Sequence, residues 1–278
     1  MLRIVKLEKH YKNNVVLNIS DFECQSSSIV GIVGPNGSGK STMLKCIAQL
    51  ISYNGDVIWN NQPINQNISV LKNFGVIIEE PFFMNSLTAY QNLDYYLDCV
   101  DDAIPYLKIL DIDTVLHNKV KTYSLGMKQK LAFALACAKG KEIELLDEPF
   151  NSMDSMSIKK CIKILKKQKK DGRLIVVVSH DSAVLNKLCD EIYVINKGKL
   201  IKLEQEEREK RDYYLKFEKD SDKMEAIKRL CAYYELEDEG LVLKVNLEEC
   251  ESIQYLRNRL SQISYTVTDS NQIWGLIC

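Results

Sequence analysis

The sequence predicts an α/β fold with a mixed sheet, followed by a small α+β domain, and three observations carry this prediction. Short apolar runs of strand length alternate with segments of helical periodicity over residues 1–203. A glycine-rich stretch, residues 34–42 (GPNGSGKST), joins one such run to a helix. Residues 204–278 carry 11 Lys and Arg against 17 Asp and Glu, a balance of −6, which leaves +5 for residues 1–203 of a chain with net charge −1. This change of charge predicts a domain boundary after residue 203.

The composition of the 278 residues, 46% hydrophobic and 27% charged, is ordinary for a globular protein. No apolar run approaches the roughly 20 residues of a membrane span, and the N-terminus alternates like a strand instead of carrying a signal-peptide block. We therefore expect the protein in the cytoplasm. The nine cysteines lack C-x-x-C spacing, which favours reduced core thiols over a metal or disulfide role.

The glycine-rich stretch matches G-x-x-x-x-G-K-[ST] and lies between a predicted buried strand, residues 29–33, and a predicted helix. Its glycines permit positive φ angles, so that backbone N–H groups can turn toward one anion. Lys40 is expected to reach the β- and γ-phosphates, and the Ser41 hydroxyl to ligate Mg²⁺. A chance match in a chain of this length has a probability of about one per cent. The expected nucleotide contacts are Gly34, Asn36, Gly37, Ser38, Gly39, Lys40, Ser41 and Thr42.

Strands are predicted at residues 2–7 and 15–24, with Tyr11 on the loop between them. An aromatic ring at this position can stack on a base, although a tyrosine beside a strand is more often a packing residue. Two further strands are predicted at residues 55–59 and 74–78, the second followed by the acids Glu79 and Glu80.

Residues 82–138 are predicted to be mostly helical. Thr88 and Gln91 have the spacing of a capping box. Ser124 begins a second helix, which Gly140 ends, and this helix points a positive end outward. Taken alone, it is an ordinary capped helix.

A strand predicted at residues 143–148 ends in Asp147 and Glu148, where an open α/β sheet places its ligand chemistry. Asp147 can hold Mg²⁺, and Glu148 is the candidate general base. A simple helix cap is the alternative for this acidic pair, and the phosphate loop decides against it. Glu144 is unusual in a central strand, and we attribute it to a locally open face.

A helix is predicted at residues 158–170 with a lysine-rich outer face, which is more often solvated than bound to lipid or nucleic acid. The buried strand predicted at residues 174–178 ends in Ser179 and His180, and His180 can donate a hydrogen bond to a γ-phosphate. Strands at residues 191–195 and 199–203 complete the domain.

These motifs, in their order, resemble those of the ATP-binding cassette (ABC) ATPases over residues 3–203. The family signature is here residues 123–127 (YSLGM), followed by Lys128 and Gln129, and residues 151–154 correspond to another family motif. The resemblance implies a cassette with a helical subdomain at about residues 82–138, and it implies ATP and Mg²⁺ as cofactors. It assigns roles as follows: Tyr11 stacks on adenine; Lys40, Ser41 and Thr42 contact phosphate and Mg²⁺; Asp147 is the Walker B carboxylate; Glu148 is the catalytic glutamate; His180 is the switch histidine.

The sequence departs from the family pattern in two places. The loop that usually supplies a glutamine to Mg²⁺ and the attacking water holds a glutamate, which we align at Glu79, with Glu80 as the alternative. Oxygen ligation survives this change, and the added charge predicts a stronger Mg²⁺ dependence. The signature lacks its first glycine and its glutamine, but Ser124 and Gly126 keep the helix-end contact available.

In this family the signature of one subunit closes on ATP held by another, so one copy of each motif implies a second cassette, identical or different. The chain contains no membrane span, so a transporter reading requires a separate permease and places the chain at the inner face of the cell membrane. The sequences around Glu79 and the signature look most like export and immunity ATPases for peptide antibiotics such as bacitracin and lantibiotics. The alternative functions are a mechanical ATPase acting on ribosomes or DNA and a non-hydrolysing binding module. The sequence has neither the second cassette nor the coiled-coil insertion that is usual in the mechanical ATPases. We therefore expect no nucleic acid partner.

The C-terminal domain, residues 204–278, carries no chemistry that its sequence identifies. Alternating strands and helices predict a small α+β domain, for which a ferredoxin-like fold is a candidate. One predicted helix has Met224, Ile227, Cys231 and Tyr234 on its apolar face, and a second has Ile253, Leu256, Leu260 and Ile263. Packing or dimer contact is the expected role, and regulation is the alternative.

Overall fold

The computed structural model describes residues 1–12, 14–79, 83–140, 142–203, 211–230, 236–239, 242–247, 260 and 266–269. The chain divides into two compact units, Met1–Lys202 and Leu203–Cys278. Among the described residues, no helix combines the length and the apolar character needed to cross a membrane.

A six-stranded sheet forms the centre of the first unit, and its strand order is β10-β9-β3-β8-β7-β6. The neighbours from β9 to β6 pair in parallel. All five residues of β8 are buried, which explains their continuous apolar sequence, LIVVV, because a parallel strand has a covered face on both sides. The strands are β3 (Ile29–Val33), β6 (Phe74–Ile77), β7 (Ile143–Asp147), β8 (Leu174–Val178), β9 (Glu191–Asn196) and β10 (Lys199–Leu203).

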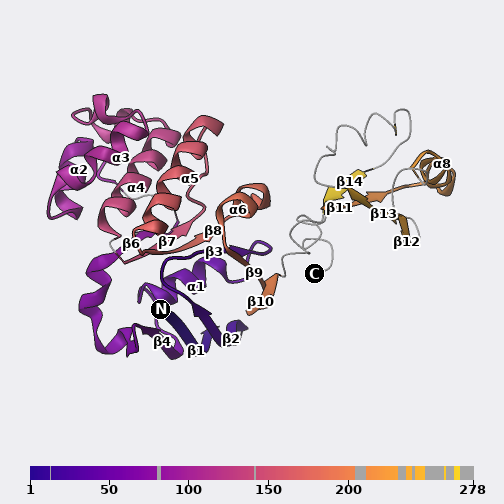
Figure 1. The fold of residues 1–278 in the computed structure, drawn as a ribbon, viewed down its shortest axis with the longest axis horizontal. Coiled ribbons are helices and arrows are strands. Elements are labelled where there is room, and N and C mark those ends of the chain that lie inside the picture. The colour runs from indigo at the N-terminus through magenta and orange to yellow at the C-terminus, as the bar shows by residue number, and fades with distance from the viewer. Residues whose placement is uncertain are drawn as a thin grey trace. The chain divides into compact units, whose positions relative to one another are not determined.

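A second, antiparallel sheet has the order β2-β1-β4-β5. Its strands are β1 (Leu2–Tyr11), β2 (Asn14–Cys24), β4 (Asn54–Trp59) and β5 (Gln62–Pro63). Helix α1 (Lys40–Ile47) lies between the two sheets and contacts β2 on one side and β7 on the other (Figure 1). Tyr11 is the last residue of β1, so its predicted place in a loop is wrong: the polar residues Glu8, Lys9 and His10 continue the pairing with β2.

Helices α2 to α5 gather on the side of the large sheet opposite to α1 (Figure 1), where α4 contacts β6 and α5 contacts β8. Both predicted caps are confirmed: Thr88 and Gln91 form a capping box at α2, and Ser124 caps α4, which Gly140 ends. Helix α5 begins three residues before the predicted start, because the Asp154 side chain accepts a hydrogen bond from the Ser157 N–H and caps it. The helices are α2 (Ala89–Tyr96), α3 (Ile104–Ile109), α4 (Leu125–Lys139), α5 (Ser155–Lys170) and α6 (Ser182–Leu188), and short 3-10 helices cover Ile64–Gln66, Ile68–Asn73, Val100–Asp102, Asp113–Val115 and Val120–Thr122.

Glu144, in the middle of β7, is fully buried, so the open face predicted for it is wrong. Its Oε1 atom accepts a hydrogen bond from Arg173 Nη1 at 3.0 Å. The same Arg173 nitrogen donates to the Cys137 carbonyl at 2.8 Å and to the Gly140 carbonyl. A buried ion pair therefore joins β7 to the end of α4 and to the residue before β8, and it explains how a carboxylate is accommodated in a central strand.

Burial raises the pKa of Glu144 from 4.5 to about 7, although Arg173 opposes that shift. The folded state therefore binds this proton more tightly than the unfolded chain does, so the contribution of Glu144 to stability falls as the pH rises from 4.5 to about 7. We expect the Glu144→Gln variant to show a flatter dependence of stability on pH in this window, the difference reaching on the order of 3 kcal/mol. Urea denaturation at several pH values measures it, and parallel curves for the variant and the parent would contradict it.

None of the six described cysteines forms a disulfide bond, and all except Cys99 are buried. Burial raises the pKa of the Cys46 thiol to about 11 and that of Cys161 to about 12. The predicted place of these cysteines in the core is therefore confirmed for five of the six, and it is wrong for Cys99.

The second unit contains an antiparallel sheet of order β12-β13-β11-β14 and the helix α8 (Asp220–Leu230). The ferredoxin-like arrangement expected for this unit stays a prediction. The inward face of α8 is Lys223, Ala226 and Leu230, whereas Met224 is 54% exposed, so its predicted place on the buried face is wrong. The second predicted helix lies outside the described residues except for Leu260, which is buried. The strands are β11 (Arg211–Lys216), β12 (Leu236–Glu239), β13 (Val242–Leu247) and β14 (Thr266–Asp269).

Candidate nucleotide site

The phosphate loop joins β3 to α1, and its three glycines have the positive φ angles that the sequence predicts: 156° at Gly34, 80° at Gly37 and 109° at Gly39. At Gly39 a Cβ atom would lie 2.7 Å from Cδ2 of Leu17 and 3.0 Å from the carbonyl oxygen of Val16. Strand β2 therefore presses against the loop so closely that only glycine fits. The first N–H groups of α1, which have no partner within the helix, end the loop and can bind an anion.

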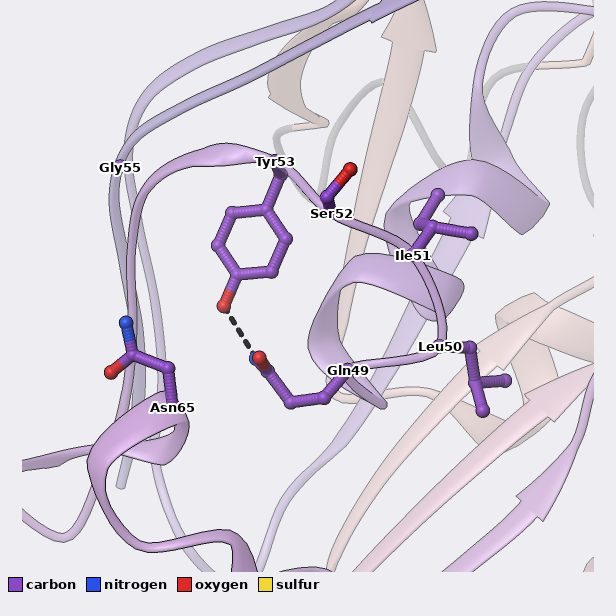
Figure 2. A pocket seen from close by; sticks show the side chains of 7 residues that line it. All are labelled: Gln49, Leu50, Ile51, Ser52, Tyr53, Gly55 and Asn65. Atoms are coloured by element: carbon purple, nitrogen blue, oxygen red, sulfur yellow. Dashed lines mark hydrogen bonds between the residues drawn. The ribbon is translucent and has the colours of Figure 1, made fainter.

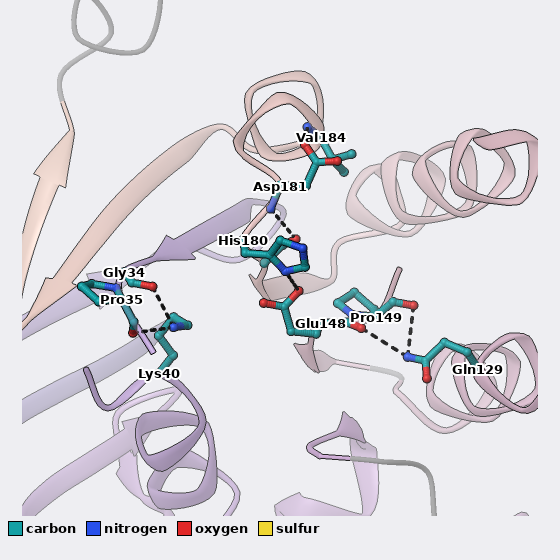
Figure 3. A network of polar contacts seen from close by, with 10 residues as sticks. Gly34, Pro35, Lys40, Gln129, Glu148, Pro149, His180, Asp181 and Val184 are labelled. Carbon is teal, nitrogen blue, oxygen red and sulfur yellow. Dashed lines mark hydrogen bonds and ion pairs between the residues drawn. The ribbon is translucent and has the colours of Figure 1, made fainter. Parts of the chain in front are cut away.

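Lys40 is folded back onto the loop that precedes it (Figure 3). Its Nζ atom donates hydrogen bonds to the carbonyl oxygens of Gly34 and Pro35, each at 2.8 Å. Partial burial lowers the pKa of the Lys40 ammonium, while Glu148 and Asp147 oppose that shift. The buried Ser38 hydroxyl has no hydrogen-bond partner among the described residues. The loop thus presents a cation and an unpaired hydroxyl, which fit an anionic phosphate group.

Asp147, at the end of β7, is 7% exposed and lies beside the phosphate loop. Burial raises the pKa of the Asp147 carboxyl group, and the negative charge of Glu79 raises it as well. A hydrogen bond with the Ser41 side chain and the positive charge of Lys40 lower it. Asp147 and the Ser41 hydroxyl are therefore in contact, with the charge of Glu79 near enough to act on Asp147, and oxygen donors of this kind are the ligands that Mg²⁺ prefers. The donor set fits this ion.

Glu79 follows β6 with φ 64°, a left-handed conformation that is uncommon for glutamate. Its carboxylate forms an ion pair with Lys45 of α1. Its side chain is 67% exposed, whereas that of Lys45 is 24% exposed. Glu80, the alternative in the sequence alignment, lies outside the described residues. The sequence did not point to Lys45, because nothing in a helical pattern marks a lysine as the partner of an acid 34 residues away.

The ion pair sharpens the prediction for Mg²⁺. We expect ATP hydrolysis by the parent chain to depend more strongly on Mg²⁺ concentration than hydrolysis by the Glu79→Gln variant, because the carboxylate adds negative charge near the metal ligands. Lys45 offsets part of that charge, so the Lys45→Met variant serves as the control and should increase the dependence further. Mg²⁺ titrations of the ATPase rate measure it, and superimposable curves for the three proteins would refute it.

Glu148 and His180 contact each other: Nδ1 of His180 lies 2.9 Å from Oε2 of Glu148 (Figure 3). Burial raises the pKa of Glu148, and His180 opposes that shift. Glu148 has φ 46°, an unfavourable angle for a glutamate, and strain of this kind is concentrated at active sites. The ends of β7 and β8 thus bring together Glu148 and His180, the two side chains that the sequence predicts at the γ-phosphate.

The residues of the predicted signature begin α4. The Ser124 hydroxyl accepts a hydrogen bond from the Met127 N–H at 3.2 Å. A Cβ atom on Gly126 would lie 2.5 Å from the carbonyl oxygen of Ser152, so this glycine allows the segment after β7 to approach the helix. Lys130, which the sequence did not single out, forms an ion pair of 3.6 Å with Asp154. The first two turns of α4 are therefore tied to the segment that follows Glu148.

Tyr11 is 48% exposed at the end of β1. The Nζ atom of Lys9 lies 4.9 Å from the centre of its ring. The hairpin that follows leads into Val16 and Leu17, which contact the phosphate loop at Gly39. This places an accessible aromatic ring on the strand pair that packs against the loop.

The described part of this unit also has hollows outside the phosphate loop. One of them, of about 280 Å³, follows the end of α1, and the hydrogen bond from Gln49 to the Tyr53 hydroxyl forms one of its walls (Figure 2). None of its lining residues that the structure describes is charged. Another is an apolar groove of about 630 Å³ beside Glu79, between β6, α2 and α4. The groove includes Leu50, Val76, Phe83, Tyr96 and Leu135.

The sequence of the chain matches the model of the ABC transporter family over residues 17–151. A lantibiotic transport ATP-binding protein, SrtF of Streptococcus pyogenes, is 32% identical over 206 residues, which cover 72% of this chain and 89% of the relative. The chain belongs to the ABC transporter family. The uncharacterized ABC transporter ATP-binding protein YhcH of Bacillus subtilis is 27% identical over 270 residues, which cover 91% of this chain and 86% of that protein.

The fold comparison agrees. The dimeric structure of the ATP-binding cassette MJ0796 in a post-hydrolysis state, bound to ADP and Pi, matches this structure with a TM-score of 0.67 and 27% identity, covering 73% of this chain and 98% of that chain. The first unit is thus an ABC ATPase cassette, as the sequence predicted, and the chain is an ATP-binding protein that hydrolyses ATP.

Proposed function

We propose that this ABC ATPase powers export through a separate membrane permease, with a peptide antibiotic or a similar compound as cargo. The similarity to a lantibiotic transport ATP-binding protein over nearly the whole length of that relative carries the proposal. The chain would work in the cytoplasm, held at the inner face of the membrane by its permease. A transporter of this kind would export a toxic compound and so contribute to antibiotic resistance.

The site supports the following roles. The phosphate loop would hold the ATP phosphates through its N–H groups and Lys40, and Tyr11 would stack on the adenine ring. Ser41, Asp147 and Glu79 would hold Mg²⁺, which when bound neutralises charge on the phosphates. Glu148 would orient the attacking water and accept its proton, since its raised pKa brings the carboxylate closer to a useful base. His180, which contacts Glu148, would hydrogen-bond to the γ-phosphate.

We further propose that two cassettes work together. Ser124 and Gly126 lie at the beginning of α4, where unpaired N–H groups and the helix dipole favour an anion, so they would close on ATP held by the phosphate loop of a second cassette. The dimeric state of the MJ0796 structure supports this arrangement for a related protein. Binding of two ATP molecules would hold the pair together, and hydrolysis would release it.

The apolar groove beside Glu79 is the surface that suits a permease. Leu50, 62% exposed, and Val76, 37% exposed, are large apolar side chains left in contact with water along it. A helix of the permease that covered this groove would sense the position of Glu79, so that closure of the cassettes would move the permease.

Recovery of the tagged chain from membranes of its own host tests the proposal. Mass spectrometry should identify a protein with several membrane spans that comes with it. The Leu50→Asp variant should lose this partner, whereas Ile201→Asp, at an equally exposed position on β10, should keep it. Recovery of the parent chain only from the soluble fraction, with ribosomal or DNA-bound proteins, would overturn the proposal in favour of a mechanical ATPase.

A further inference from the structure

One buried side chain that the proposed mechanism does not use lies against the catalytic segment. Gln129, on α4, is 6% exposed. Its Nε2 atom donates to the carbonyl oxygen of Glu148 at 3.3 Å and to that of Pro149 at 3.2 Å (Figure 3). These bonds join the helix that carries the signature to the main chain of Glu148, so one amide group links two functional parts of the same cassette.

We propose that Gln129 is a positioning residue for ATP hydrolysis, which holds the main chain of Glu148 in the conformation that aims its carboxylate at the attacking water. This proposal rests on the role proposed for Glu148. Gln129 itself does not contact the reacting atoms.

The backbone at Glu148 needs such support. Its φ angle of 46° is unfavourable for a residue with a side chain, and it persists only where several contacts fix it. The Glu148 N–H donates to the Val178 carbonyl at 2.9 Å, and the Glu148 carbonyl accepts from the Asn151 N–H at 3.2 Å. The Gln129 side chain also donates to the Glu148 carbonyl, and it donates to the carbonyl of the next residue, Pro149. Among these contacts, the hydrogen bonds from Gln129 are the ones that come from α4.

The position of Gln129 on α4 would connect the Glu148 main chain to the movement of that helix. Gln129 lies about one turn after Gly126, in the helix whose beginning would close on the ATP of the second cassette. Helices move as rigid elements, so a shift of α4 on closure would be transmitted through the amide to Glu148. Closure at one ATP would then set the geometry of the base at the other.

The Gln129→Met variant tests the proposal, because methionine has a similar volume and no N–H donor. We expect kcat and kcat/KM to fall together, roughly tenfold, with KM for ATP unchanged, as for a loss of contacts that serve the transition state alone. The Gln168→Met variant is the matched control. Gln168 is 2% exposed and donates to the Cys137 carbonyl at 3.3 Å and to the Tyr106 hydroxyl at 3.5 Å, so it loses a comparable pair of bonds elsewhere.

A double-mutant cycle separates positioning from simple stabilisation. In the Glu148→Gln background, single-turnover rates should show little further loss from Gln129→Met, because the two residues act as one unit. Additive losses, or an equal loss of kcat in the Gln168→Met control at matched melting temperature, would overturn the proposal. A normal rate for Glu148→Gln alone would instead remove the role of Glu148 on which it rests, so the two failures can be told apart.

Discussion

The Glu148→Gln variant is expected to bind ATP normally and to hydrolyse it 10²- to 10⁴-fold more slowly, the range that loss of a general base produces. Glutamine preserves the shape of the side chain and its contact with His180, but it cannot accept the proton of the attacking water. Since ATP then persists, the variant should accumulate a closed pair of cassettes. Phosphate release measures the first effect, and gel filtration with ATP measures the second.

The Glu191→Gln variant is the control for this experiment. Glu191 forms an ion pair with Lys202 and accepts a hydrogen bond from Tyr193 at 3.0 Å, all on the β9 side of the sheet. It should hydrolyse ATP like the parent chain. Normal turnover by Glu148→Gln would disprove the assignment of the base, and slow turnover without a dimer would retain the base and refute the model of two ATP molecules holding the pair.

Much of the cassette could be predicted because its signals are local. The buried strands are short runs of β-branched residues, and each helix start carries its own cap, as at Thr88 and Ser124. The phosphate loop is a continuous stretch, so its glycine conformations follow from the sequence itself. Asp154 is a similar signal: its cap starts α5 at Ser155, three residues before the start that apolar periodicity predicts.

The contacts that the sequence did not reveal join residues far apart in the chain. Lys45 and Glu79 are 34 residues apart, Glu144 and Arg173 are 29 apart, and Gln129 lies 19 residues before Glu148. Each pair depends on the order of strands in the sheet, which periodicity does not provide. Glu144 is an example. The sequence around it indicates only that a charged residue interrupts an apolar strand, whereas the structure shows that Arg173 is the cation that pairs with it.

The Arg173→Met variant is expected to lower the free energy of unfolding by about 3–5 kcal/mol, because it removes one partner of a buried ion pair and leaves the other charge without compensation. Two carbonyl groups, those of Cys137 and Gly140, lose a donor at the same time. The pKa of Glu144 should rise further, since burial already raises it and Arg173 is the group that opposes this. Urea denaturation followed by circular dichroism measures the loss.

The double variant Arg173→Met with Glu144→Gln identifies the cause of this loss. If the uncompensated carboxylate dominates, glutamine at position 144 should restore a large part of the stability, because a neutral amide costs much less to bury than a charge. If the loss comes from the carbonyl groups at the end of α4, the double variant should be no more stable than Arg173→Met alone. The first outcome would mean that Arg173 is retained mainly to allow an acid in β7, and the second that it fastens the last turn of α4 to the sheet.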